Sequence, residues 1–164
     1  MESAKKQLGE VIRSFEQEGF LSYHFRMAQA VKKFDGSFAF LELIANFRVD
    51  CQSTFRILTQ ELDQPVISFQ YMELQCLKLK GASSSLGIPR MALACGDLRQ
   101  AISNNSKDEC VLALNRVKHE FEGMQDKLDL ICQIMVGNSC SNGALCVAAR
   151  EEGRQSSFPD AMTN

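Results

Sequence analysis

Apolar residues recur every three or four positions along most of the chain, the spacing of one face of an α-helix. The clearest run alternates steps of four and three from Cys110 to Met135. Another long run extends from Phe40 to Leu62, and Pro65 follows its end. The pattern predicts four long helices at residues 37–62, 66–82, 89–103 and 107–135. Their predicted core contains Phe47, Phe55, Met72, Cys95, Leu98, Val117 and Phe121.

Two shorter amphipathic segments precede these helices. The first ends near Gly19, and the second begins near Ser22 and ends at Asp35-Gly36. The second segment places Phe25, Ala28, Val31 and Phe34 on its apolar face. We therefore expect an all-α fold, an antiparallel up-down four-helix bundle with two short N-terminal helices packed on one end. An irregular all-α domain is the alternative.

The connections carry recognisable start and stop signals. Ser83 to Gly87 is expected to interrupt or loosen the chain, and Pro89 suits the first turn of the next helix. Ser106 and Glu109 form a capping-box pattern before the last helix. After this helix the apolar pattern dissolves into a stretch rich in Ser, Asn and Gly. The chain is thus divided into a helical domain at 1–136 and a disordered tail at 137–164, with one or two helical turns possible over 144–152.

Composition excludes several classes of function. The 164 residues carry a net charge of −2, which argues against a nucleic-acid binder, and no apolar run is long enough to span a membrane. The chain has seven cysteines without a Cys-x-x-Cys pair, two histidines and no secretion signal. We therefore expect no disulfide framework, no metal site and buried, reduced cysteines. No phosphate-binding loop or nucleophile elbow is present, so we expect neither an enzyme nor a cofactor.

One predicted helix, 66–82, departs from the amphipathic pattern. Leu74 lies almost opposite its apolar stripe, and Leu77 lies about a third of a turn from the stripe. Gly81 follows one turn after Leu77, although glycine costs about 1 kcal/mol against alanine inside a helix. The pattern favours close approach of another surface. Alternatively, the two leucines pack under the N-terminal helices and Gly81 permits a tight helix contact.

The stretch from Leu77 to Gly87 reads Leu-Lys-Leu-Lys-Gly-Ala-Ser-Ser-Ser-Leu-Gly. It resembles the histidine-containing phosphotransfer proteins (HPt) of plants, the intermediates of the cytokinin two-component phosphorelay. The family pattern is close to H-Q-[FL]-K-G-S-S-[ST]-S-[IVL]-G. Phe47-Arg48-Val49-Asp50 and Val117-Lys118-His119-Glu120-Phe121 are also similar to family segments. The likeness covers about residues 3–135 and implies the HPt bundle.

The departures from the family pattern decide the expected function. Leu77 stands where the phosphorylatable histidine belongs, Lys78 replaces the usual glutamine, and Ala82 replaces a serine. The resemblance thus implies a pseudo-phosphotransfer protein that binds receiver domains of response regulators and hybrid histidine kinases without carrying phosphate. The expected partner-binding residues are Leu74, Leu77, Lys78, Lys80, Gly81 and Ser84.

We expect this protein to be a monomer in the cytoplasm and nucleus that dampens signalling. Two alternatives remain at this point. One is a decayed paralogue that docks with nothing, and the other is an active phosphocarrier that uses His24 or His119.

Overall fold

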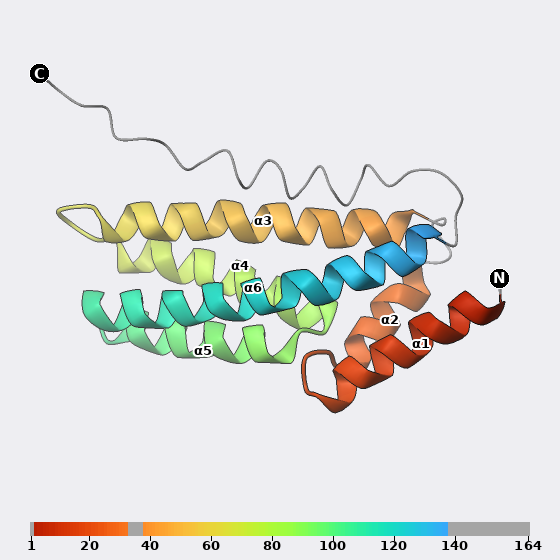
Figure 1. Cartoon of the computed structure of the whole chain (residues 1–164). Coiled ribbons are helices and arrows are strands. Elements are labelled where there is room, and N and C mark those ends of the chain that lie inside the picture. The colour runs from red at the N-terminus through yellow and green to blue at the C-terminus, as the bar shows by residue number, and fades with distance from the viewer. Residues whose placement is uncertain (1, 33–37, 138–164) are drawn as a thin grey trace, which may run out of the picture.

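The structure is a computed structural model that describes residues 2–32 and 38–137. These residues form helices and short connections, with no strand among them (Figure 1). The helices are α1 (Glu2–Gln17), α2 (Tyr23–Lys32), α3 (Ala39–Leu62), α4 (Phe69–Leu86), α5 (Pro89–Ser103) and α6 (Lys107–Gly137).

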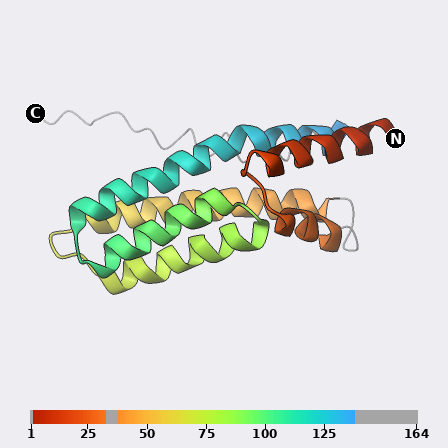
Figure 2. The same ribbon diagram turned by 90° about the horizontal axis from the view of Figure 1, so that it is seen from below.

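Helices α3 to α6 alternate in direction and form the bundle, as Figure 1 shows. Helix α1 lies along the C-terminal half of α6, while α2 packs against α3 and α4 at the same end (Figure 2). The predicted antiparallel bundle with two N-terminal helices on one end is therefore confirmed, and the irregular alternative is wrong.

The interior is built from the apolar stripes that the sequence displays. All seven predicted core residues are buried, namely Phe47, Phe55, Met72, Cys95, Leu98, Val117 and Phe121. The Phe121 ring lies edge-on to Phe55, with centroids 5.3 Å apart, and joins α6 to α3. Cys51, Cys76, Cys95, Cys110 and Cys132 are buried free thiols. The expectation of buried, core-filling cysteines is confirmed for these five, whereas Cys140 and Cys146 lie outside the described residues.

Helix α4 differs from the predicted range 66–82 at both ends. Its N-cap is Ser68, whose hydroxyl accepts from the Tyr71 amide. The predicted interruption after residue 82 is wrong, because α4 continues to Leu86. Ser83 Oγ donates to the Leu79 carbonyl at 2.7 Å, so its polar side chain is satisfied within the helix. Burial of Leu86 then fixes the last turn.

Gly87 ends α4 and joins it to α2. Its φ of +79° is a left-handed conformation that favours glycine. Its carbonyl accepts from the Ser22 amide at 2.9 Å, and a Cβ at this position would overlap the Phe25 backbone nitrogen. Phe25 itself is fully buried. The start of α2 is therefore seated directly on the C-terminal end of α4.

The N-terminal segment is also fastened to the bundle through Phe20. The Lys127 ammonium lies 3.8 Å from the Phe20 ring centroid, and the Arg90 guanidinium lies 4.5 Å from the same centroid. Two cations from α5 and α6 thus hold the connection between α1 and α2.

The second helix and the C-terminal segment differ in how far the structure describes them. Val31 was expected on the apolar face of the second helix, but it is 57% exposed because α2 turns Phe25 and Ala28 toward the bundle instead. Phe34 and the tail from residue 138 onward lie outside the described residues.

Candidate functional site

The outward face of α4 holds the six residues that the sequence predicts as a docking surface. We call Leu74, Leu77, Lys78, Lys80, Gly81 and Ser84 the α4 face. All are exposed except Lys80, which is half-buried. Leu74 and Leu77 are 52% and 42% exposed, so neither packs under the N-terminal helices. The structure therefore places the six residues together on one side of one helix.

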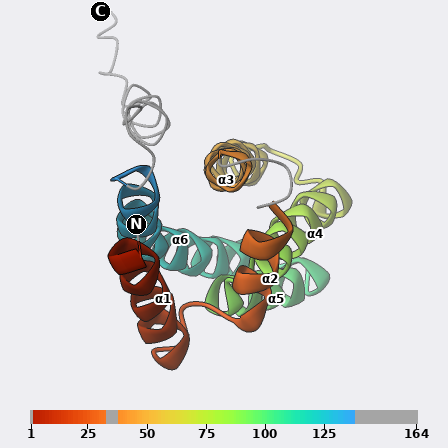
Figure 3. The ribbon, with the colours of Figure 1, turned by 90° about the vertical axis from the view of Figure 1, so that its right-hand side faces the viewer.

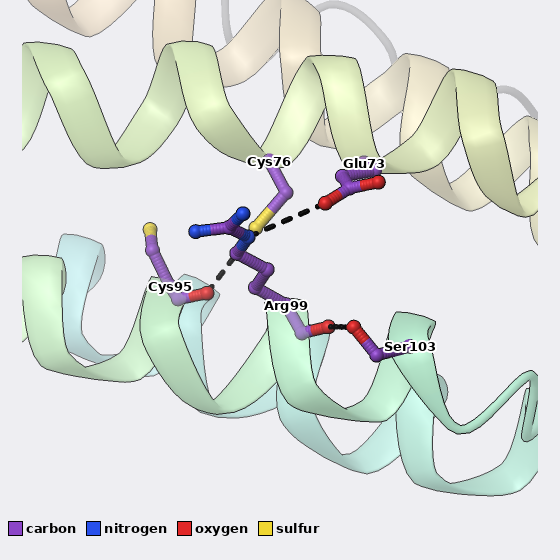
Figure 4. A network of polar contacts seen from close by, with 5 residues as sticks. All are labelled: Glu73, Cys76, Cys95, Arg99 and Ser103. Atoms are coloured by element: carbon purple, nitrogen blue, oxygen red, sulfur yellow. Dashed lines mark hydrogen bonds and ion pairs between the residues drawn. The ribbon is translucent and has the colours of Figure 1, made fainter.

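The buried side of α4, and its edge beside the α4 face at Glu73, contact α5. Figure 4 shows its contacts with α5: the Cys76 thiol donates to the Cys95 carbonyl at 3.2 Å, and Glu73 pairs with Arg99 at 3.3 Å. The Ser103 hydroxyl donates to the Arg99 carbonyl at 3.1 Å on the same side of α5. Together with the buried side chains of Met72, Cys76 and Leu79, these contacts pack α4 against the bundle.

Lysines flank Leu77 on both sides. Lys80 stands seven residues, or two helical turns, after Glu73, and Glu73 pairs with Arg99 of α5, so Lys80 lies on the α5 side of α4. Lys78 lies on the α3 side, where it lines a cavity together with Asp50. The α4 face therefore has an apolar centre between two cations.

Gly81 has no packing role within the described residues. A Cβ built on it would meet no heavy atom within 4 Å beyond its own helix backbone. The alternative that Gly81 permits a tight internal helix contact is therefore wrong. Because Gly81 has no side chain, nothing protrudes from the helix one turn after Leu77, beside the exposed Ser84.

Hollows adjoin the α4 face on either side of its leucines. One of about 490 Å³ borders Leu74 and Leu77 and reaches Ser68 and Tyr71 at the start of the helix. Two others, of about 400 Å³ and 170 Å³, lie between α3 and α4 and share Asp50 and Ala82 in their walls. We call these two the α3–α4 groove; Figure 3 shows the two helices that border it, viewed end-on.

The α3–α4 groove could not be predicted from helical spacing. Helix α3 is tied to α6 instead, through a buried ion pair in which Arg48 contacts Asp129 at 2.7 Å. At the far end of α3, the Lys118 ammonium donates to Thr59 Oγ1 at 2.9 Å. Polar partners as distant in sequence as these are not visible from helical spacing, although Asp50 itself stands in a segment with family resemblance.

A second exposed apolar stripe lies on α2. Tyr23, Met27 and Val31 follow each other at one-turn intervals, and all are exposed. Of these three residues, the sequence analysis placed only Val31 on a helix face, and it predicted that this face is buried. The spacing of four between these three residues was the signal that could have identified the stripe.

Neither histidine of the chain belongs to the α4 face. His24 is exposed on α2, where Ser22 Oγ lies 3.4 Å from its Nδ1, and His119 is exposed on α6. The start of α2 meets α4 at Gly87, which lies ten residues, or about 15 Å of helix, beyond Leu77. The α4 face therefore presents no imidazole.

Two further findings concern the described residues as a whole. No three His, Cys, Asp or Glu side chains in 2–32 and 38–137 are arranged to hold a metal ion. Within the same ranges, every helix is too short or too polar to cross a lipid bilayer.

A four-helix bundle that carries Lys-Gly-Ala-Ser-Ser-Ser in α4 has the architecture of a phosphotransfer domain. Residues 42–127, from the first turn of α3 into α6, match the family model of the Hpt domain, and the chain belongs to this family.

Plant proteins resemble the chain over most of its length. Histidine-containing phosphotransfer protein 2 of Oryza sativa subsp. japonica is 26% identical over 131 residues, 79% of this chain and 88% of the relative. Histidine-containing phosphotransfer protein 1 of Arabidopsis thaliana is 25% identical over 130 residues, 79% of this chain and 84% of the relative.

Solved structures show the same fold. A histidine-containing phosphotransfer protein from maize superposes with a TM-score of 0.72 at 26% identity, covering 80% of this chain and 96% of that one. A putative phosphotransfer protein from rice gives a TM-score of 0.75 at 24% identity, covering 81% and 94%.

Proposed function

We propose that this protein is a pseudo-phosphotransfer protein, which binds receiver domains through the α4 face without carrying a phosphoryl group. The observation that carries the proposal is Leu77. By the motif resemblance it stands where the family has its phosphorylatable histidine, and it is exposed at the centre of the α4 face. Its side chain has no nitrogen that could form a phosphoramidate.

The surroundings of Leu77 support retained docking. Protein interfaces combine a buried apolar centre with a polar rim, and Leu74 and Leu77 between Lys78 and Lys80 have this arrangement. Receiver domains carry an acidic cluster around their phosphorylated aspartate, which complements the two lysines. Gly81 supports the same conclusion, because no contact within the described fold explains a glycine there.

In the cell, such a protein would occupy receiver domains that active phosphotransfer proteins need. We propose on this basis that it is a monomeric negative regulator of a cytokinin-type relay, acting in the cytoplasm and nucleus on response regulators and hybrid histidine kinases. A competition assay tests this role: adding the protein to a reconstituted relay should slow transfer between an active phosphotransfer protein and its receiver.

Docking is tested by titration calorimetry of a panel of receiver domains with the parent and with Leu77→Ala. We expect the truncation to weaken binding by about 1–2 kcal/mol, because it removes the centre of the interface. Leu93→Ala is the matched control, since Leu93 is a 72% exposed leucine on α5, away from the α4 face. If no receiver binds the parent, the chain is a decayed paralogue. If both variants weaken binding equally, the assigned surface is wrong.

Phosphate transfer provides the second test. Incubation with a phosphorylated receiver should leave the parent unlabelled, whereas Leu77→His should accept at least some phosphate, because Lys80 and Gly81 already stand beside it. Lys78 and Ala82 depart from the family pattern, so we expect partial rescue. Stable label on His24 or His119 of the parent would instead establish an active phosphocarrier.

A further inference from the structure

We propose that residues 144–152 of the chain's own C-terminal tail dock in the α3–α4 groove. The proposal depends on three observations: the shape and chemistry of the groove, the distance from the end of α6, and the sequence of the segment. None of them requires that receiver domains bind the protein.

The α3–α4 groove has the properties of a site for a short apolar segment. Leu79, Phe47 and Leu86 contribute apolar walls, and its two parts have volumes of about 400 Å³ and 170 Å³. Its rim holds one acid, Asp50, and one base, Lys78, both exposed. Such a groove buries apolar side chains and offers a partner for one charge of either sign.

The end of α6 lies within reach of this groove. The Arg48–Asp129 ion pair fixes the register of α3 against the antiparallel α6. Helix α6 continues eight residues past Asp129 to Gly137, about 12 Å, which brings Gly137 level with the first turn of α3. Leu43, one turn further along α3, lines the near end of the groove. The six residues 138–143 can span about 20 Å, enough to cross the width of one helix.

The segment beyond this connection matches the groove in chemistry. It reads Ala-Leu-Cys-Val-Ala-Ala from Ala144 to Ala149, followed by Arg150, Glu151 and Glu152. This is the longest apolar run after residue 137, and it ends in one base and two acids. Arg150 complements Asp50, and an acid beside it complements Lys78. Tethering raises the local concentration of the segment into the millimolar range, so even weak contacts populate the docked state.

Docking would have a regulatory consequence, which rests on the proposed function. A segment lying in the groove covers Lys78, which also belongs to the α4 face. The tail and a receiver domain would then compete for one surface, and the protein would carry its own inhibitor. The docking itself can be tested without any receiver, so its failure and the failure of the proposed function are separate results.

Docking can be tested by comparing the labelling rates of two cysteines in the same tail. Cys146 lies inside the segment, whereas Cys140 lies in the connection. We would label the full chain with iodoacetamide, follow both sites by peptide mass spectrometry, and normalise each rate to that in concentrated urea. If nine-tenths of the molecules are docked, Cys146 should react about tenfold more slowly than Cys140.

Variants on both partners identify the occupied surface. Ser53→Trp places a bulky side chain on the exposed rim of the groove, and Leu145→Asp puts a charge into the apolar segment; each should raise the Cys146 rate to that of Cys140. Ser103→Trp is the matched control, because Ser103 is an exposed serine on α5, outside the groove. It should change neither rate. Equal rates for both cysteines in the parent would overturn the proposal. So would protection of Cys146 that survives Ser53→Trp, or that disappears on dilution, because the occupant would then lie elsewhere or come from a second copy.

Discussion

Gly81→Ala should strengthen the fold while weakening docking. A Cβ at residue 81 meets no heavy atom within 4 Å, so alanine fits without displacing a neighbour. Inside a helix, alanine is more favourable than glycine by about 0.8–1.0 kcal/mol. We therefore expect the free energy of unfolding, measured by urea denaturation with circular dichroism, to rise by about 1 kcal/mol. For a chain of this size the midpoint of thermal unfolding should rise by about 2–4 °C.

The same methyl group should oppose a receiver domain that approaches the α4 face closely. Overpacking at a fitted contact costs about 1–3 kcal/mol, so the dissociation constant should rise at least about fivefold in calorimetric titrations. Gly123→Ala is the matched control, because Gly123 is an exposed helical glycine on α6 that also has open space around its Cβ position. It should stabilise the fold equally and leave receiver binding unchanged.

Gly87→Ala should have the opposite effect on stability. The left-handed conformation costs a non-glycine residue about 1–2 kcal/mol. The new Cβ would also displace the Phe25 backbone and weaken the Ser22–Gly87 hydrogen bond, which is worth about 1 kcal/mol. We expect a loss of at least about 2–3 kcal/mol.

Three results would refute this reasoning. If Gly81→Ala destabilises the protein, the glycine serves the fold and not a partner. If Gly81→Ala leaves receiver binding unchanged, residue 81 lies outside the interface. If Gly87→Ala is as stable as the parent, α2 is not seated on the C-terminal end of α4 as described.

Further predictions concern the interior and the rim. Burial raises the pKa of Cys76 to about 11 and that of Cys95 to about 12, so above pH 9 the unfolded chain releases protons that the folded chain keeps. Unfolding free energy should fall by about 1.4 kcal/mol per thiol and pH unit there, and a flat profile from pH 8 to about pH 10.5 in urea titrations would contradict this. Asp129→Ala strands the buried Arg48 guanidinium and should cost about 3–5 kcal/mol in the same assay; a loss below about 1 kcal/mol would show that the ion pair is dispensable. Lys78→Gln should reduce the salt dependence of receiver affinity, and an unchanged salt slope would exclude Lys78 from the interface.

Helical spacing predicted the bundle well because each long helix buries one continuous stripe. The run from Cys110 to Met135 needed no other information, and the structure extends that helix only to Gly137. Helical spacing led to a wrong prediction where a polar side chain forms its hydrogen bond within its own helix. Ser83 looks like a helix breaker in the sequence, yet its hydroxyl bonds back to Leu79 and the helix continues.

The exposed leucines could be predicted from the sequence, because their positions on the wheel conflict with burial. The α3–α4 groove could not be predicted in the same way. It results from the position of α3, which is fixed by Arg48 and Asp129 across 81 residues of sequence. Which helix an exposed stripe faces is likewise a property of packing, and this is why Val31 was assigned to the wrong side of α2.

The exposure of Leu77 also bears on how such a protein arises. Residue 77 contributes nothing to the core, so exchanging histidine and leucine there should change stability by no more than about 0.5 kcal/mol. Each of the two histidine codons differs from one leucine codon by a single nucleotide. On the proposed function, a point mutation turns a signal carrier into a competitor, or restores it, without passing through an unfolded intermediate. Selection at this position then acts on the flow of signal alone, free of any constraint from folding.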